Sequence, residues 1–552
     1  MQQAKYYITT CLLAIAFTIN AQLPTGPEIA WQRCYGTSGG DNFFDAIVTS
    51  DNSIVASIYY GGYDGDATGL FSLSLPAGLI KFDSDFNVIW QNFFGGSDNI
   101  SYFKKVVELN NSYIAAAGNS SAYDVDFPDN HGNLDFIIVS TDYNGNKLWS
   151  KSYGGPGVDE TEGFIATLDG GYLLTGSTNG SGGDIPFHYG SGFTNDAIVI
   201  KTDSMGEILW LKVLGGSAND SPIGDVVEID RGYYIINIGT YSNDYDLTDS
   251  GFEGLKRWII KIDSLGNKVD ESFMEGNVDL YTYTNDMVIP FGDGFMVVGN
   301  GNANSLLYPT SPEHALEEGA VAIFNADLEL TFFKQWGGGH IDGFKRVVQD
   351  QNGNFIFLGY SESIDYDLPG NYNGGETVDY WLFATDSNFN PLWSKNFGGS
   401  APCGDLGCSN FSGNLVLKDN MLLAFIKNTI PDSFPDYDIE CGMEGTNDYY
   451  TDAWLIAFDL TTAIQQENIP QQIFAITPNP ANNTIFISST VSINAHLQIT
   501  LTSLNGILVF KEEVYFTDTL QLNIPDLTDG MYIIQCLNTS VQNAQLLLII
   551  QP

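Results

Sequence analysis

Paired aspartates recur along this chain at one place in a repeated pattern, and they are its best candidates for ligand chemistry. In an extended segment, residues two apart point the same way, so both carboxylates of an Asp-x-Asp pair can reach one ion. Hard oxygen ligands suit Ca²⁺, which needs several further oxygens to complete its shell. The pairs therefore predict either calcium-binding loops or turns that the carboxylates cap and solvate. The five pairs are Asp64 and Asp66, Asp124 and Asp126, Asp244 and Asp246, Asp365 and Asp367, and Asp436 and Asp438.

Catalytic residues cannot be assigned from linear motifs. The stretch at residues 36–40, GTSGG, fits the G-x-S-x-G pattern, but it lies in a repeated turn and follows no buried α/β-hydrolase strand. The 5 histidines are scattered without the spacing of a zinc protease. Acidic residues are too numerous to single out a glycosidase-type pair. The catalytic residues are unknown, and the sequence favours a non-enzyme over an enzyme.

The charge balance excludes one large class of partners. The chain carries 67 Asp and Glu residues against 21 Lys and Arg residues, a formal net charge of −46. Such a surface repels phosphate backbones and anionic headgroups, so we expect no nucleic-acid partner. Hydrophobic residues make up 43% of the chain, aromatic residues 13%, and 59 residues are Gly. This mixture is typical of many short strands joined by turns.

The N-terminus has the pattern of a secretory signal peptide over residues 1–21. Lys5 supplies a positive start, residues 11–19 form an apolar run, and a small residue precedes the expected cleavage point. The run is shorter than the ~20 residues of a membrane-spanning helix, and no later segment is long and apolar enough to be one. We therefore expect an exported protein without a transmembrane segment, in which disulfides persist. The short spacing of Cys403 and Cys408 favours a local disulfide between them.

A repeat of about 60 residues dominates the chain. Each period carries an anchor residue, mostly Trp, with a Gly five residues later in six of the seven periods. An Asp or Asn seven residues before the anchor closes an apolar run and opens a short turn, as in a capped β-hairpin. Self-similarity at this period indicates a repeat architecture. The anchors are Trp31, Trp90, Trp149, Trp210, Asp270, Phe332 and Trp393.

Four strands fit in each period, which is the content of one blade of a β-propeller. The first anchor strand, residues 28–36, has no three strands before it, and the last period leaves the pattern at Asp459 without a fourth strand. We therefore predict seven blades, with residues 28–36 paired to residues 452–459. Closure of this kind removes the sheet edges of an open array. The anchor Trp is expected between neighbouring blades, where its large ring is buried.

The repeats carry a family resemblance. Stretches such as YIAAAGNSSAYDVDFPDNHGNLDFIIVSTDYNGNKLWSKSYGGPGVDE resemble the bacterial seven-bladed propeller repeats known as SBBP repeats. The resemblance covers residues 28–459, and it departs in the fifth blade, whose loop lacks the acidic pair. It implies a propeller fold and an exported location, and it implies no reaction.

The repeat pattern ends at Asp459, and the polar residues 460–472 indicate a linker. Residues 473–552 alternate apolar strands with Asn-Gly and Asp-Gly turns, which predicts a small β-sandwich. This segment resembles the type A sorting domain of the type IX secretion system. The match rests on Pro478, Asn479 and Pro480, on the turn Leu504-Asn505-Gly506, and on Gly530 and Tyr532. The resemblance implies type IX secretion machinery as a partner and a secreted or outer-surface location.

Together these patterns predict an all-β chain in four parts: a signal peptide (1–21), a seven-bladed β-propeller closed by an N-terminal strand (22–459), a linker (460–472) and a sorting domain (473–552). We expect an exported cell-surface or secreted protein, non-catalytic, that binds or adheres to glycan or protein. The alternative is a secreted polymer-degrading hydrolase or lyase with its site on the propeller face. No cofactor is indicated beyond Ca²⁺ at the Asp-x-Asp pairs.

Overall fold

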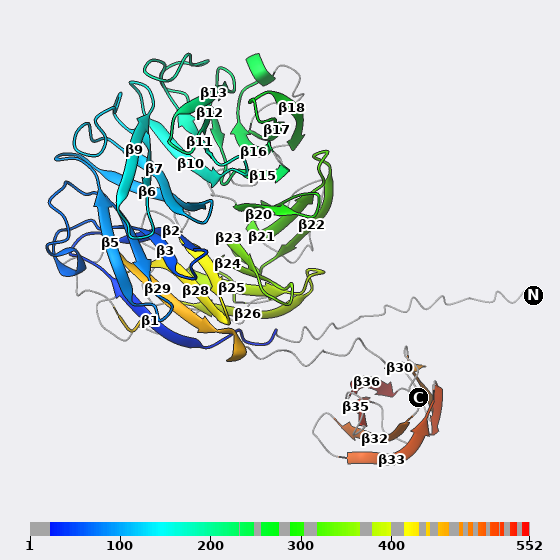
Figure 1. Cartoon of the computed structure of the whole chain (residues 1–552). Coiled ribbons are helices and arrows are strands. Elements are labelled where there is room, and N and C mark those ends of the chain that lie inside the picture. Colours follow the sequence, from blue (N-terminus) through cyan, green and yellow to red (C-terminus); the bar gives the residue numbers. More distant parts are fainter. Residues whose placement is uncertain are drawn as a thin grey trace, which may run out of the picture. The chain divides into compact units, whose positions relative to one another are not determined.

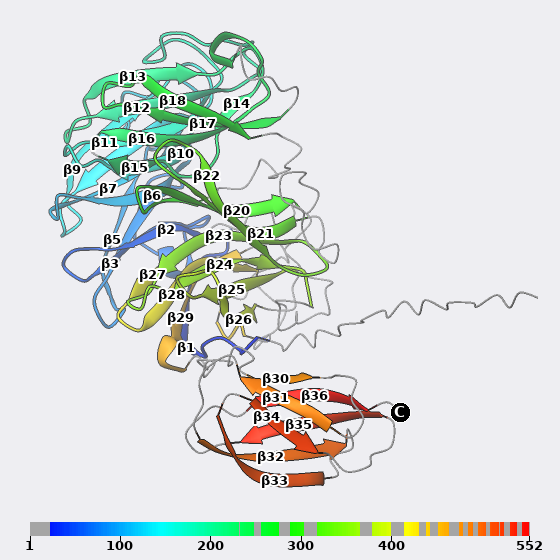
Figure 2. The same cartoon turned by 90° about the vertical axis from the view of Figure 1, so that its right-hand side faces the viewer.

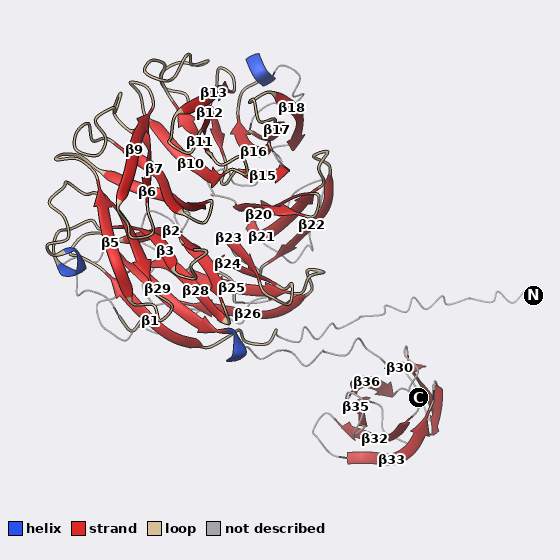
Figure 3. Cartoon of the chain, viewed as in Figure 1, coloured by secondary structure: helices blue, strands red, loops and turns tan. Residues whose placement is uncertain are grey.

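The chain is all-β, as predicted. The computed structural model describes residues 23–462 except 231, 248–254, 275–286, 303–316, 365–377, 399–412, 430–437 and 442–450; further on, it describes residues 474–477, 484–489, 495–503, 508–517, 519–523, 530–537 and 544–550. The helical elements within this part are single 3₁₀ turns, η1 (Gly65–Ala67), η2 (Tyr245–Leu247) and η4 (Leu460–Thr462) (Figure 3). No helix in the described ranges has the length and apolarity needed to cross a bilayer.

Seven antiparallel sheets stand around a common axis as the blades of a propeller (Figure 1). The first strand of each blade lies nearest the axis. Blade 1 is β2 (Asn42–Val48), β3 (Ile54–Tyr59), β4 (Ala77–Phe82) and β5 (Val88–Phe94); blade 2 is β6 (Ser101–Leu109), β7 (Tyr113–Ser120), β8 (Asp135–Thr141) and β9 (Lys147–Tyr153); blade 3 is β10 (Asp159–Ala166), β11 (Tyr172–Thr178), β12 (Asp196–Thr202) and β13 (Ile208–Leu214).

The remaining blades follow the same order, with the first strand of blade 4 broken in two. Blade 4 is β14 (Asp220–Pro222), β15 (Val227–Asp230), β16 (Tyr233–Thr240), β17 (Lys256–Ile262) and β18 (Lys268–Met274); blade 5 is β19 (Met287–Phe291), β20 (Gly294–Asn302), β21 (Glu317–Phe324) and β22 (Leu330–Trp336); blade 6 is β23 (Asp342–Gln349), β24 (Phe355–Ser361), β25 (Asp379–Thr385) and β26 (Pro391–Phe397); blade 7 is β27 (Asn414–Lys418), β28 (Met421–Thr429), β29 (Thr451–Asp459) and β1 (Ile29–Tyr35).

The N-terminal strand closes the ring, which confirms the predicted pairing. Strand β1 runs antiparallel to β29, with Ile29 opposite Phe458 and Tyr35 opposite Ala453. Blade 7 therefore takes its outermost strand from the start of the chain and its other three from the end of the repeat region. A ring closed in this way has the same number of strands in its last blade as in a regular blade, so the sheet edges that remain are the short ones of single blades.

Each blade is buried on both faces, so its middle strands are nearly continuous apolar runs. In β8, Ile137 and Val139 pack toward blade 1, in a cluster that includes Phe94. The alternate residues Phe136 and Ile138 pack toward blade 3. Because side chains alternate between the faces of a strand, every middle strand contributes to two cores. The hydrophobic core is therefore distributed over the junctions between blades.

The turn between the third and fourth strands is capped by its own first side chain, as the sequence predicts. In blade 2, Asp142 Oδ1 accepts hydrogen bonds from the N–H groups of Asn144 and Asn146, both at 2.9 Å. These short turns are therefore capped hairpins. The same two-amide arrangement is made by Asp83, Asp203, Asp263, Asn325 and Asp386.

The fourth residue of these hairpins has a positive φ, and in blade 2 it packs against the anchor side chain of blade 1. Gly145, with φ 80°, lies under Trp90, where a Cβ atom would come within 2.9 Å of the indole ring. The indole Nε1–H donates to the carbonyl of Tyr143 in the same turn, at 3.1 Å. Glycine is needed here because it tolerates both the backbone conformation and the close approach. The anchor Trp thus lies between blades, as predicted.

The C-terminal unit is a second compact body, and the chain divides between Ile464 and Gln465. Its strands form two sheets, as the predicted β-sandwich requires (Figure 2). One contains β30 (Phe474–Thr477), β31 (Thr484–Ser489) and β34 (Thr519–Asn523); the other contains β33 (Leu508–Phe516), β32 (Ala495–Ser503), β35 (Gly530–Leu537) and β36 (Ala544–Ile550). Pro478, Asn479 and Pro480 lie outside the described residues, whereas Gly530 and Tyr532 lie in β35.

Candidate functional site

The Asp-x-Asp loops follow the second strand of their blades and reach the outer strand of the blade before. At the junction of blades 7 and 1, three consecutive amides of residues 36–38 each donate to a different carboxylate. Asp66 accepts from the first amide at 2.9 Å, Asp41 from the second at 2.6 Å, and Asp64 from the third at 2.7 Å. We call this arrangement the turn cradle.

The turn cradle repeats around the ring. At the junction of blades 3 and 4 it is complete, because Asp246, Asp220 and Asp244 accept from the amides of residues 215, 216 and 217 at 3.1, 2.7 and 2.7 Å. The carboxylates of Asp126 and Asp124 accept from Gly95 and Ser97 at 2.9 Å each, and Asp438 accepts from Gly398 at 3.2 Å. Asp365, Asp367 and Asp436 lie outside the described residues.

The cradle supplies a structural reason for two acids two residues apart. The two carboxylates of a pair bind alternate amides of one turn, so each pair ties its loop to the neighbouring blade. Hydrogen bonds from Ser38 lower the pKa of Asp64, and those from Ser97 and Ser217 lower the pKa of Asp124 and Asp244. A carboxylate that accepts such bonds is stabilised in its charged form.

Calcium binding by the pairs stays a prediction. Within the described ranges, no group of three or more His, Cys, Asp or Glu side chains is arranged to hold a metal ion. Two carboxylates supply only part of the six to eight oxygens that Ca²⁺ takes. The geometry therefore assigns the described pairs to turn binding and leaves any ion to be tested directly.

The residue between the two aspartates projects into solvent from a strained backbone. Gly65, Val125 and Tyr245 occupy this position with φ values of 52°, 55° and 50°. A positive φ is uncommon for bulky residues and most costly for a β-branched one. Val125 and Tyr245 are nevertheless 61% and 57% exposed, so their side chains gain little packing in return. The cradle on either side holds the backbone in this conformation.

Exposed aromatic side chains accompany these loops in the first four blades. Tyr63 and Tyr123 directly precede the pairs of blades 1 and 2, and Phe187 and Tyr245 occupy the corresponding loops of blades 3 and 4. We call these four residues the rim aromatics. All four are exposed, Tyr123 to 61%. Tyr189 lies between Phe187 and Tyr245, with ring centroids 5.0 and 4.7 Å apart, and joins blades 3 and 4 into one aromatic surface.

Near the axis, a network of opposite charges connects the first strands of several blades. Lys104 pairs with Glu162 at 3.2 Å, and Lys105 forms an ion pair with Asp225. Asp45 accepts the amide of Val106 at 2.8 Å and also pairs with Asn414. The polar groups of this network therefore satisfy one another, which makes it a structural element at the axis.

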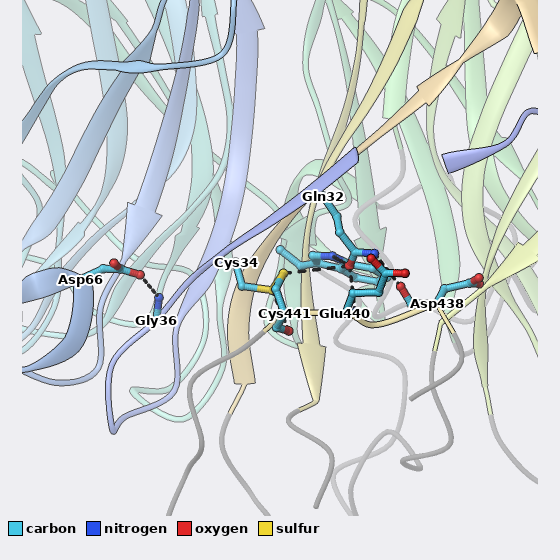
Figure 4. The surroundings of a disulfide bond; sticks show 8 residues. Gln32, Cys34, Gly36, Asp66, Asp438, Glu440 and Cys441 are labelled. Atoms are coloured by element: carbon cyan, nitrogen blue, oxygen red, sulfur yellow. Dashed lines mark hydrogen bonds between the residues drawn. A yellow bond between two sulfur atoms is a disulfide. The ribbon is translucent and has the colours of Figure 1, made fainter. Parts of the chain in front are cut away.

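A disulfide lies at the seam where the ring closes (Figure 4). Cys34 on β1 is bonded to Cys441, 407 residues further along the chain, with their Cα atoms 5.6 Å apart. Beside it, the Gln32 side chain donates to the carbonyl of Asp438 at 2.8 Å and accepts from the indole of Trp454 at 3.0 Å. The segment 438–441 is therefore held against β1 by covalent and polar contacts.

This disulfide was not predicted from the sequence. The two cysteines lie far apart in the chain, so their spacing does not indicate that they are bonded. The export signal and the closure of the ring, taken together, could have suggested a disulfide across the seam. The predicted partners Cys403 and Cys408 lie outside the described residues. The stretch GTSGG is a cradled turn, and the amide of its Ser38 is bound by Asp64.

The fold places the first unit in the class of seven-bladed β-propellers. Residues 475–551 match the family described as a secretion system C-terminal sorting domain. The chain is therefore delivered by the type IX system and is secreted or attached to the outer cell surface. Assignment of the repeats to the SBBP type stays a prediction, and so does the signal peptide, which lies outside the described residues.

No curated protein sequence matches the chain. Among solved structures, it is similar to the extracellular domain of a putative hybrid two-component system from B. thetaiotaomicron, with 11% identity, a TM-score of 0.29, and coverage of 92% of this chain and 68% of that one. It is also similar to the parainfluenza virus 5 hemagglutinin-neuraminidase ectodomain, with 8% identity, a TM-score of 0.33, and coverage of 64% and 81%.

A family 43 arabinoxylan arabinofuranohydrolase from Bacillus subtilis is similar over 96% of this chain and 95% of its own length, with 10% identity and a TM-score of 0.29. Identities and TM-scores this low support no argument about the activity of this chain.

Proposed function

We propose that the propeller is a non-catalytic extracellular binding module that holds a neutral glycan chain on the face formed by the rim aromatics. The observation that carries this proposal is the recurrence of exposed aromatic rings in the corresponding loop of four successive blades. Single exposed apolar residues are ordinary, but a repeated set held on rigid turns is typical of a binding surface. Tyrosine combines an apolar ring with a hydroxyl, which suits a ligand with both kinds of group.

The distribution of the rings favours a glycan over a protein. A protein interface has a contiguous apolar centre surrounded by a polar rim. Here the rings of Tyr63, Tyr123 and Tyr245 belong to different blades and are each accompanied by carboxylates. A chain of sugar rings can stack on separated platforms and offer its hydroxyls to the acids between them. The net charge of −46 disfavours acidic polysaccharides, so the expected glycan is neutral.

The test is an array of neutral and acidic glycans together with a screen for release of new reducing ends. We expect binding to neutral chains and no release. The variant Tyr123→Ala/Tyr245→Ala removes two of the rings and is expected to bind about tenfold more weakly. This loss corresponds to about 1.4 kcal/mol of binding free energy. The matched control is Leu168→Ala/Leu265→Ala, which removes two exposed apolar side chains from turns of the opposite face.

Three outcomes would contradict the proposal. Binding lost equally in the control variant would point to a general change in the protein. Binding only to a protein ligand would replace the glycan by a protein partner. Release of reducing ends that survives purification would make the propeller a hydrolase or lyase, as in the alternative prediction.

A further inference from the structure

Two buried carboxyl groups face each other at the junction of blades 2 and 3. Asp135 begins β8 in blade 2, Asp159 begins β10 in blade 3, and both are 0% exposed. A Cβ atom at Gly154 would lie 2.5 Å from Asp159 Oδ2 and 2.9 Å from Asp135 Oδ1. The two carboxyl groups therefore border the same glycine, and residue 154 has no room for a side chain.

The partners of this pair leave one oxygen of each acid, Asp135 Oδ1 and Asp159 Oδ1, without a hydrogen bond among the described residues. Asp135 Oδ2 accepts the amide of His131 at 2.5 Å, and Asp159 Oδ2 accepts the amide of Gly155 at 2.8 Å. Asp135 Oδ1 is buried and has no hydrogen-bond partner among the described residues. A buried polar atom without a partner is costly, so the observed packing calls for a donor that faces this atom.

The same arrangement recurs at three other junctions. One acid of each pair is the first or second residue of the third strand of a blade. The other acid begins the first strand of the next blade or directly precedes it. Each is at most 1% exposed. The pairs are Asp196 and Asp220 between blades 3 and 4, Glu318 and Asp342 between blades 5 and 6, and Asp452 and Asp41 between blades 7 and 1.

The junction of blades 1 and 2 differs, and it provides a natural contrast. Its corresponding residues are Ala77 and Ser101, which are uncharged and fully buried. Ser101 Oγ shares a hydrogen bond of 2.7 Å with Ser120. A junction of this fold therefore packs without any acid, so the four acidic pairs are not a requirement of the propeller geometry.

We propose that each acidic pair holds one shared proton, so that the four junctions are stabilised in mild acid and weakened in base. One proton between two carboxyl groups converts a repulsion into an O–H···O hydrogen bond and supplies the donor that Asp135 Oδ1 lacks. Two carboxyl groups buried beside each other disfavour each other's ionised form, so one of them tends to keep its proton.

The electrostatics of the pairs agree with this geometry. Burial, together with a smaller contribution from the facing acid, raises the pKa of Asp41, Asp135 and Asp342 to about 7 and that of Asp196 to about 6. A folded pKa above the unfolded value stabilises the protein below the unfolded pKa of ~4, and this stability is lost as the pH rises through about 7.

Other charged groups lie near three of the pairs, and their effects must be distinguished from that of the shared proton. The His131 ring lies 3.5 Å from Asp135 Oδ2, and Asp184 lies beyond it. His188 lies 3.7 Å from Asp196, with Asp244, Asp246 and Lys256 also near that pair. Asp66 accepts the amide of Gly36 and Asp41 that of Thr37, so another carboxylate lies near the pair of Asp41. Glu318 lowers the stability of the ionised form of Asp342, so this pair provides a test beside that of Asp135.

The experiment measures the melting temperature of the full chain from pH 5 to pH 8. We expect a fall of roughly 5 °C across this range. In Asp342→Asn, the amide can donate where the shared proton lies, so the fall is expected to shrink by about a quarter, with no loss of stability at pH 8. Asp135→Asn is expected to do the same, also in a His131→Gln background. The control Asp64→Asn changes an exposed cradle acid and leaves the slope unchanged.

A second measurement detects the proton itself. Infrared spectra at pH 6 are expected to show the C=O stretch of protonated carboxyl groups, weaker in Asp342→Asn and absent at pH 9. A spectrum without this band at pH 6 would overturn the proposal. The proposal would also fail if the melting temperature of both Asp342→Asn and Asp135→Asn fell with pH as steeply as that of Asp64→Asn. It would fail as well if Na⁺ or Ca²⁺ fully restored the stability that the native protein loses at pH 8, since a cation would then occupy the pair.

Discussion

The two faces of the propeller use the same residue type in different ways. On the hairpin face, Asp142 caps the turn that it begins, and both amides that it binds lie within four residues of it. On the rim face, Asp246 and Asp244 bind the amides of residues 215 and 217 in the preceding blade. A cap of the first kind stabilises one blade, whereas a cap of the second kind joins two. The comparison teaches that the Asp-x-Asp acids join neighbouring blades, whereas the turn-capping acids act within one blade.

The largest expected effect comes from removing the strand that ends in a cradled turn. Deleting residues 22–36 removes β1, its disulfide and the first amide of the cradled turn, which Asp66 binds. We expect the melting temperature to fall by roughly 10 °C or more, because β29 then becomes an exposed edge. Calorimetry of the exported protein measures it. An unchanged melting temperature would show that the ring stays closed without its seam.

The next largest effect concerns the covalent part of the same seam. Cys34→Ser is expected to lower the free energy of unfolding by about 2–5 kcal/mol, since the bond closes a very long loop. Denaturant unfolding with and without a reductant measures this difference. The control Cys536→Ser, in β35 of the C-terminal unit, should leave propeller unfolding unchanged. If reductant weakens Cys34→Ser as much as the native protein, another disulfide is responsible.

A direct comparison of the two kinds of cap comes third. Asp246→Ala is expected to cost about 2 kcal/mol, because it leaves an amide of the preceding blade without its charged acceptor. Asp142→Ala should cost less, since its turn is exposed and water replaces the carboxylate. Urea unfolding of the two single variants tests the order. Equal losses would mean that the rim contributes no more cohesion than the hairpin face.

A smaller effect is expected in the loss of folding stability at low pH. Hydrogen bonds lower the pKa of Asp142 and Asp244. A lowered folded pKa contributes stability above the unfolded pKa of ~4, and that stability is lost as the pH falls below it. Stability should therefore decline below pH ~4, and this decline should be shallower in Asp244→Ala than in the native chain. A parallel decline in both would remove Asp244 from the acid response.

The smallest expected effect is that of calcium. Because the cradle acids already accept amide hydrogen bonds, millimolar Ca²⁺ is expected to shift the melting temperature by no more than about 2 °C relative to chelator. Asp124→Asn/Asp126→Asn should abolish any shift that occurs. A larger shift that depends on these two residues would show that the pairs are ion ligands as well as caps.

The repeated local pattern allowed much of the fold to be predicted. The hairpin caps, the four strands per period and the closing strand depend on residues that are close in sequence or on simple counting, and the structure confirms them. For the rim loops, the sequence predicted the paired acids and did not predict the groups that they bind. Asp-x-Asp was recognised as a recurring pair, but its partners lie roughly thirty residues earlier in another blade. No pattern within the loop indicates that partner.

The sequence by itself determined the number of blades, the strand that closes them and the sorting domain, because hydrophobic period, turn chemistry and motif are local properties. Only the tertiary structure decided what the acids do. It brought Asp135 to Asp159, and Glu318 to Asp342, across blade junctions, and Cys34 to Cys441 across the seam. The physical reason is that burial and distance set the charge and the bonding of these groups, and both arise only when the ring closes.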